Sequence, residues 1–172
     1  MMKIRIEKTS LLGALTTFVL LFAVAVGDAK AQLPSISLKD IDGNSIKTDT
    51  LAKSGKPIII SFFATWCKPC LRELNAIAEV YEEWQEETGV ELIAVSIDEG
   101  ANSLKVKPLV VSQEWNFKVL LDTNKEFMRA MNVSMVPALF LIDKKGKIVY
   151  THTGYNVGAE QKLYKEVKKC IQ

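Results

Sequence analysis

Two spacings of apolar residues along the chain predict a protein built from strands and helices. Residues 35–51 alternate apolar and polar positions on both sides of Asp42-Gly43, a hairpin turn signal, so we expect an N-terminal β-hairpin. Ile58–Phe63 is a continuous apolar run, which indicates a central strand covered on both faces. Val90–Ile97 has the same character and predicts a second buried strand.

Spacings of three and four residues mark the helices. After the central strand, six apolar residues recur at this spacing and predict one long amphipathic helix that ends near Thr88-Gly89: Leu71, Leu74, Ile77, Ala78, Tyr81 and Trp84. Further helices are expected over residues 101–114, with an interruption at Pro108, and over 124–131 and 158–171. Shorter strands are expected over 117–121, 138–143 and 148–152, the last two forming a hairpin.

The first 31 residues have the features of a secretory signal. Lys3, Arg5 and Lys8 precede an almost wholly apolar stretch from Leu11 to Val26, and Ala29-Lys30-Ala31 matches an A-x-A cleavage site. We therefore expect residues 1–31 to be a signal peptide and the mature chain to begin at Gln32, outside the cytoplasmic membrane and in the periplasm. An uncleaved signal that anchors the protein to the outer face of that membrane is the alternative.

Length and charge limit what the remaining chain does. Residues 32–172 have the size of one domain with a substantial core. The first 31 residues carry four Lys or Arg and two Asp or Glu, which leaves 18 of each sign in the rest. A balanced charge gives no reason to expect nucleic acid or an anionic membrane surface as a partner.

Two cysteines at the end of the central strand carry the candidate chemistry. If Cys67 opens a helix, unpaired backbone N–H groups and the helix dipole stabilise its thiolate and make it nucleophilic. Cys70 then lies one turn further along the helix, within reach of a disulfide. The alternative, half of a zinc site, has weak support because the only other cysteine and histidine are Cys170 and His152, which show no paired ligand spacing.

Five segments of the chain resemble the thioredoxin superfamily, specifically its exported TlpA/ResA-like branch: Asp40-x-x-Gly43, Phe62-Phe63-Ala64-Thr65-Trp66-Cys67-Lys68-Pro69-Cys70, Ile97-Asp98-Glu99, Val136-Pro137 and Phe140-Leu141-Ile142-Asp143-Lys144-Lys145-Gly146. The resemblance implies a thioredoxin-like α/β fold. It has a central mixed sheet of four or five strands flanked by helices, an N-terminal β-hairpin, and an insert that contains residues 101–114.

The resemblance also implies roles for single residues. Cys67 is the expected nucleophile and Cys70 the resolving thiol, the two forming a redox-active disulfide. Pro137 is expected to be a cis-proline facing that disulfide, which leaves the backbone of Val136 free to pair with an extended substrate. Substrate-binding residues are then expected on both sides of the disulfide: Trp66, Lys68, Pro69 and Val136.

Two positions depart from the pattern of relatives. Ser61 stands where thioredoxin carries a buried aspartate that takes the proton of the second cysteine, and an ordinary hydroxyl does not do this at neutral pH. Glu99, at the end of the second buried strand, is the expected replacement; the alternative is an exposed carboxylate without a catalytic role. Val136 replaces a threonine found in many relatives, which removes one possible donor to the thiolate.

These expectations describe an exported thiol-disulfide oxidoreductase with no cofactor and no metal. The resemblance favours a reductase of disulfides in other exported proteins, with a membrane thiol reductase as the electron donor. A disulfide oxidase or isomerase is the nearest alternative, and Cu(I) delivery by the cysteines with His152 is a more distant one. A peroxidatic site is disfavoured, because Thr65 lies only two residues before Cys67. Cys170 is expected to be a half-buried spectator and His152 a surface residue.

Overall fold

A computed structural model describes residues 33–172, and seven strands in it form a single sheet in the order β2-β1-β5-β4-β3-β6-β7. The strands are β1 (Ser37–Asp40), β2 (Ser45–Lys47), β3 (Ile58–Phe63), β4 (Glu91–Ser96), β5 (Lys118–Leu121), β6 (Ala138–Ile142) and β7 (Ile148–Thr153). β3, β4 and β5 run parallel, whereas β6 is antiparallel to β3, so the sheet is mixed, as expected.

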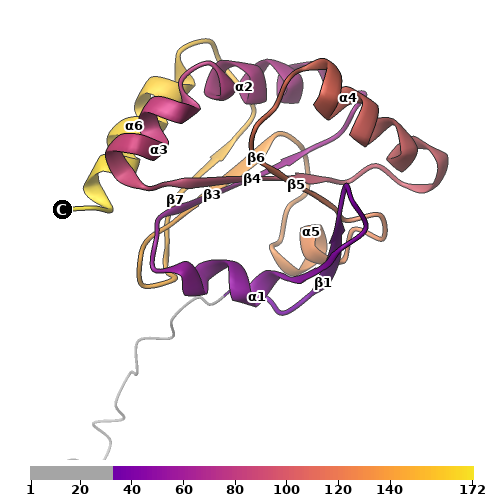
Figure 1. Cartoon of the computed structure of the whole chain (residues 1–172), viewed down its shortest axis with the longest axis horizontal. Coiled ribbons are helices and arrows are strands. Elements are labelled where there is room, and N and C mark those ends of the chain that lie inside the picture. Colours follow the sequence, from indigo (N-terminus) through magenta and orange to yellow (C-terminus); the bar gives the residue numbers. More distant parts are fainter. Residues whose placement is uncertain (1–32) are drawn as a thin grey trace, which may run out of the picture.

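Helices cover both faces of this sheet. They are α1 (Thr48–Leu51), α2 (Lys68–Ala78), α3 (Tyr81–Thr88), α4 (Val106–Ser112), α5 (Glu126–Ala130) and α6 (Ala159–Lys169), with 3₁₀ turns η1 (Ala52–Ser54) and η2 (Gly100–Lys105). Figure 1 shows α2, α3, α4 and α6 on one face and α1 and α5 on the other. Every residue of β3 is buried, because this strand lies between two helical layers and has a neighbouring strand on each side.

The central mixed sheet, expected with four or five strands, has five, in the order β5-β4-β3-β6-β7. β1 pairs antiparallel with β5, so the N-terminal hairpin extends this sheet to seven strands. The hairpin is also shorter than the alternating pattern predicts, since the chain turns helical at Thr48.

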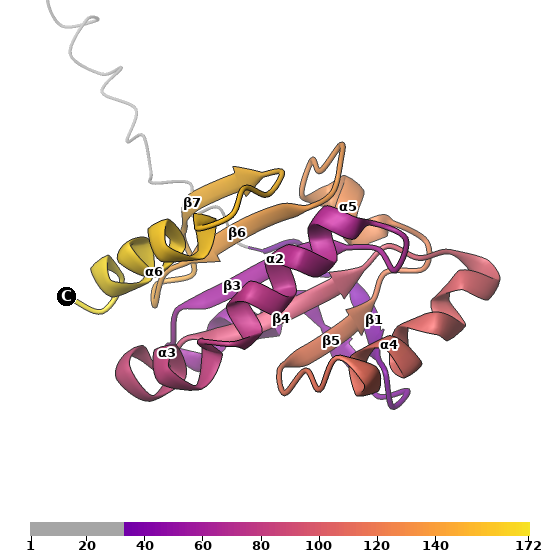
Figure 2. The same ribbon diagram turned by 90° about the horizontal axis from the view of Figure 1, so that it is seen from above.

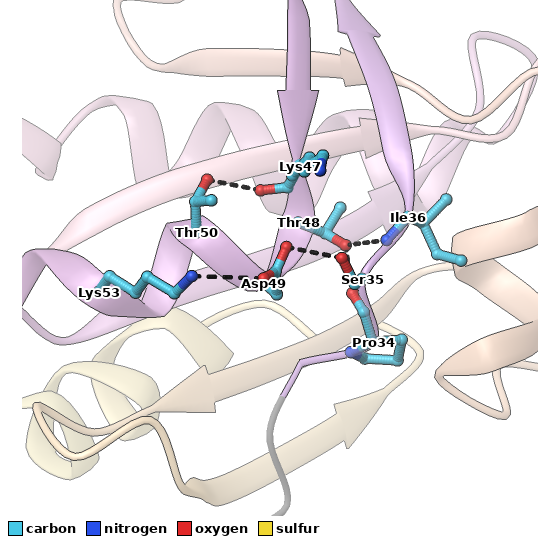
Figure 3. A network of polar contacts seen from close by, with 8 residues as sticks. All are labelled: Pro34, Ser35, Ile36, Lys47, Thr48, Asp49, Thr50 and Lys53. Atoms are coloured by element: carbon cyan, nitrogen blue, oxygen red, sulfur yellow. Dashed lines mark hydrogen bonds and ion pairs between the residues drawn. The ribbon is translucent and has the colours of Figure 1, made fainter.

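The chain turns at Thr48 because this buried side chain fastens the start of the fold. Its hydroxyl accepts a hydrogen bond from the Ile36 N–H at 3.0 Å and donates one to the Pro34 carbonyl. Beside it, the Ser35 hydroxyl donates to Asp49 at 2.9 Å (Figure 3). The first turn of α1 therefore holds the segment that precedes β1.

The single long helix expected after the cysteines is two helices. The chain leaves helical geometry at Val80, where φ is −119° and ψ is 1°. The change of direction lets Trp84 stack on Tyr164 of α6, with ring centroids 4.8 Å apart, and this packing outweighs continuity of the helix. The predicted end is confirmed: Gly89, at φ +69°, closes α3 in the left-handed region that glycine adopts readily.

The insert begins as the 3₁₀ turn η2 and continues as α4. Pro108 does not interrupt it, because it is the third residue of α4. At that position a backbone N–H has no partner within the helix, so the missing donor costs nothing.

Within the part of the chain from Leu33 to the C-terminus, no helix is both long and apolar enough to cross a membrane. The predicted signal peptide and the predicted mature start at Gln32 lie outside the described residues.

Candidate functional site

Cys67 and Cys70 form a disulfide where the loop after β3 enters α2. Cys67 is the N-cap residue of α2, and its sulfur accepts a hydrogen bond from the Cys70 N–H at 3.3 Å. Pro69 occupies the first turn, where proline suits a helix start. The sequence therefore places the first sulfur at the positive end of a helix, where a thiolate is stabilised.

The two cysteines differ in exposure. Cys67 keeps 5% of its surface exposed, whereas Cys70 is fully buried. Trp66 and Lys68 on either side of Cys67 are exposed, the tryptophan at 64%, and Pro69 is half-buried. An external molecule thus reaches Cys67 and the predicted substrate-binding side chains beside it before it reaches Cys70.

The loop before β6 lies next to this site. The Val136–Pro137 peptide bond is cis, as the resemblance implies. Ala138 pairs with Phe62, so Pro137 lies beside the end of β3, close to the start of the loop that carries the cysteines. The Pro137 carbonyl accepts a hydrogen bond from the Gly154 N–H at 2.9 Å. Met135 of the same loop is an exposed apolar side chain at the surface.

Asp98 fixes the loop that precedes Cys67, a role that sequence reasoning missed. This buried carboxylate accepts hydrogen bonds at 2.8 Å from both the N–H and the hydroxyl of Thr65, and another at 2.9 Å from Ser96. The end of β4 therefore holds the residue two positions before the nucleophile. The sequence does contain a clue to this role, an acidic residue directly after a buried strand, but the prediction was made for its neighbour Glu99.

Glu99 points away from the buried part of the site. Its side chain is 61% exposed, and its carboxylate forms an ion pair with Lys125 at 2.6 Å. The role of proton carrier remains a prediction for this residue, with the Lys125 pair as its observed contact.

Glu73 is a second carboxylate that sequence reasoning missed, and it lies on the buried face of α2 one turn beyond Cys70. Its carboxylate accepts a hydrogen bond from the Ser61 hydroxyl at 3.0 Å. Burial disfavours the charged form and raises the pKa of Glu73 to about 7, although the Ser61 bond acts in the opposite direction. Ser61, at the position where thioredoxin carries its aspartate, thus donates a hydrogen bond to a glutamate of the facing helix.

His152 differs from the surface histidine expected. It is half-buried in β7, and its Nε2 atom is fully buried. Cys170 is half-buried, as expected, and its thiol donates to the Glu166 carbonyl. Across residues 33–172, no three His, Cys, Asp or Glu side chains gather closely enough to hold a metal ion.

Comparison with known proteins places this geometry among thioredoxin-like proteins. The model of the AhpC/TSA family matches residues 29–151. A thiol-disulfide oxidoreductase ResA from Bacillus subtilis is 36% identical over 121 residues, which cover 70% of this chain and 65% of that protein. The ResA of Geobacillus thermodenitrificans is 34% identical over 132 residues, covering 77% of this chain and 71% of that protein.

One solved structure is more similar in sequence. It is the solution structure of an uncharacterized thioredoxin-like protein from Porphyromonas gingivalis, 60% identical, with a TM-score of 0.73. The match covers 83% of this chain and 93% of that one. The thioredoxin-like fold and the ResA-like resemblance expected from the motifs are both confirmed. The chain spans 65% of the length of the Bacillus subtilis relative.

Proposed function

Because this chain belongs to the AhpC/TSA family and has ResA-like relatives, we propose that it is a thiol-disulfide oxidoreductase that exchanges disulfides with other proteins. One observation carries the proposal: of the two cysteines in a disulfide at the start of a helix, only the first keeps any exposed surface. A purely structural disulfide needs neither this position nor an exposed tryptophan beside it.

The first step is attack by Cys67 of the reduced protein. Its thiolate, stabilised by the Cys70 N–H and the end of α2, attacks one sulfur of a substrate disulfide. A bond forms between Cys67 and that sulfur, and the substrate's other sulfur leaves as a thiolate that takes a proton from water. The product is a mixed disulfide on Cys67.

The second step is resolution by Cys70. Its thiol loses a proton and attacks the Cys67 sulfur, which restores the internal disulfide and releases the second substrate sulfur as a thiolate. Glu73 supports this step, because it lies one turn away on the same buried face of α2 and its pKa of about 7 makes it a proton acceptor near neutrality. Two electrons have then passed to the substrate, and an external dithiol must return the protein to its reduced state.

Substrate binding involves the surface around Cys67. Trp66 supplies an exposed apolar face, with Lys68 and Pro69 on the other side of the nucleophile. The backbone of Val136 pairs with an extended substrate segment, a short form of β-augmentation. Support comes from the position of this loop beside the end of β3.

The physiological setting that we propose is the periplasm, with other exported proteins as substrates. Residues 1–31 direct export, and a membrane thiol reductase supplies electrons, so net flow is reductive. A disulfide oxidase or isomerase uses the same two cysteines and is the first alternative. A Cu(I)-delivery protein would instead take up stoichiometric copper and keep it against a competing chelator.

Trapping in whole cells tests this function. Cys70→Ser leaves Cys67 able to attack but removes resolution, so mixed disulfides with exported proteins should accumulate and disappear on reduction. Cys67→Ser is the matched control and should trap nothing. If the trapped partners become oxidised in cells that lack the protein, it is a reductase; if they become reduced, it is an oxidase. A Cys70→Ser variant that forms no mixed disulfides would refute exchange with proteins.

A further inference from the structure

His152 contains a buried atom whose environment needs an explanation. Among the fully buried side-chain nitrogen and oxygen atoms of residues 33–172, its Nε2 is the one without a hydrogen-bond partner. Buried polar groups in native proteins are nearly always paired, with protein or with ordered water. His152 is also the only histidine of the chain.

Strand register places His152 on the same face of the sheet as Ser61. Ser61 of β3 pairs with Leu139 of β6, and Leu139 pairs with His152 of β7. Directly paired residues of neighbouring strands project to the same side. That side is the one covered by α2 and α6, which Figure 1 shows on one face of the sheet; in Figure 2, α2 crosses over β3 and β4, and α6 lies beside β7. Glu73 approaches this row from α2 and bonds to its Ser61 end.

Glu73 and His152 line one small cavity between α2, the sheet and α6. The space open to the centre of a water molecule measures about 10 Å³, which is room for one water. Its polar lining comes from Glu73, Tyr150, His152 and Glu160. A buried water needs two to four polar partners, and this lining provides them.

We propose that one buried water in this cavity joins the Glu73 carboxylate to Nε2 of His152, making His152 a positioning residue for the proton transfer at Cys70. The proposal rests on the proposed function. The Cys70 thiol gives its proton to the Glu73 carboxylate, the carboxyl gives a proton to the water as the water gives one to the imidazole, and the exposed part of His152 releases a proton to solvent. The Cys70 proton therefore leaves on the α6 side of the sheet while substrate covers Cys67.

The other groups around Glu73 do not replace His152 in this path. Tyr150 of β7 and Tyr155 of the following loop have a raised pKa, in both cases mainly through burial, so their phenols stay neutral near pH 7. Arg72 of α2 and Glu160 of α6 bring charges of opposite sign near this region, and Tyr155 bonds to Glu160 at 3.3 Å. Ser61 and Cys70 are neighbours from β3 and α2, and Lys162 and Glu166 of α6 bring one charge of each sign near Tyr150.

Carboxyl NMR titration of the oxidised protein tests the link without requiring turnover. His152→Phe removes the nitrogen that supports the Glu73 carboxylate through water, so the pKa of Glu73 should rise by about one unit. His152→Gln keeps a hydrogen-bonding group and should give an intermediate value. Thr151→Val, which changes the exposed neighbour of His152 in β7, is the matched control and should leave the titration unchanged.

The rate of mixed-disulfide resolution gives a second readout. If the pKa of Glu73 is about one unit higher in His152→Phe, the rate of resolution should fall by up to about tenfold below pH 7. The difference from wild type should disappear as the pH rises. In a Glu73→Gln background the same substitution should change nothing. An unchanged Glu73 titration in His152→Phe, or equal slowing with and without Glu73, would overturn the proposal. Failure of the proposed function would appear separately, as a wild-type protein that exchanges no disulfides.

Discussion

Glu73 is a carboxyl group whose burial costs the folded protein free energy. Only 3% of its surface is exposed, and its hydrogen-bond partner is the Ser61 hydroxyl. A neutral donor offsets little of the cost of burying a negative charge, so the protonated form persists to about pH 7. Such a group both accepts and releases a proton at physiological pH, which a surface carboxylate does not do.

Replacing Glu73 should slow resolution more than attack. Glu73→Gln keeps the size and the contact with Ser61 but cannot take a proton, so we expect the mixed disulfide to accumulate and resolution to fall by ~10² to 10⁴. Stopped-flow measurement of both steps checks this, with Glu99→Gln as the matched control at an exposed, ion-paired site. Slow resolution in Glu99→Gln with normal resolution in Glu73→Gln would return the role to Glu99.

The same residue should give stability an unusual pH dependence. The folded protein holds the Glu73 proton more tightly than the unfolded chain, because the pKa rises from 4.5 to about 7 on folding. The native state therefore loses stability as pH rises through this window, by on the order of 3 kcal/mol for a pKa difference of this size.

Urea unfolding at about pH 5 and pH 8 measures this effect. The free energy of unfolding of Glu73→Gln, relative to that of wild type, should be greater at pH 8 than at pH 5. The exposed Glu99→Gln should show no such trend. A Glu73→Gln stability difference that is equal at both pH values would mean that Glu73 titrates normally in the folded state.

At the scale of elements, the fold depends on contacts that join segments far apart in the sequence. Asp98 links the end of β4 to the loop before α2, and Thr48 links the start of α1 to the segment before β1. Both side chains are buried, and each bonds to the backbone of another segment. Loss of either leaves partly buried backbone groups unpaired.

The Thr48 contact predicts a measurable stability loss. Thr48→Val keeps the shape of the side chain but leaves the Ile36 N–H and the Pro34 carbonyl without their partner. Unpaired buried groups cost roughly 1–3 kcal/mol, which denaturant unfolding would detect. Thr50→Ala removes an exposed hydroxyl two residues away and should change stability by less than about 0.5 kcal/mol. Equal effects of the two substitutions would show that the Thr48 hydroxyl does not fasten this segment.

At the scale of the whole molecule, the first residue that the structure describes already belongs to the core. Leu33 is buried and belongs to the main hydrophobic cluster, one residue beyond the predicted mature start at Gln32. Cleavage there would leave in place every core residue of the described part, residues 33–172. We therefore expect the intact mass of the exported protein to match a chain that begins at Gln32. A membrane-bound form that retains residues 11–26 would instead establish an anchored protein.

The sequence predicted the parts of this fold that local patterns determine. β3 is recognisable because all six residues are apolar or small, and the cysteines follow it at the spacing that a helix start requires. The break at Val80 was not predictable in this way, because the stacking of Trp84 on Tyr164 is a tertiary contact. Likewise, the hairpin's pairing with β5 depends on segments separated by most of the domain.

The candidate site also has parts that local sequence patterns predict and parts that depend on tertiary contacts. Cys67, Cys70 and Pro137 belong to local motifs: the two cysteines form the expected disulfide, and the bond before Pro137 is cis. Glu73 and His152 occupy inward positions of a helix and a strand, but their residue types suggest a surface location. Both line one small cavity between α2, the sheet and α6, which is a tertiary feature that the sequence pattern does not reveal.

The outer edge of β7 bears on solubility. This six-residue strand ends the sheet and pairs only with β6 among the described strands, while the opposite edge, β2, has three residues. Its outward side chains Val149, Thr151 and Thr153 are β-branched, a composition that favours pairing with another strand. Three lysines precede it in the tight turn: Lys144, Lys145 and Lys147. Charged side chains at an edge strand, lysine above all, hinder its pairing with another chain, so this turn opposes self-association through the open edge.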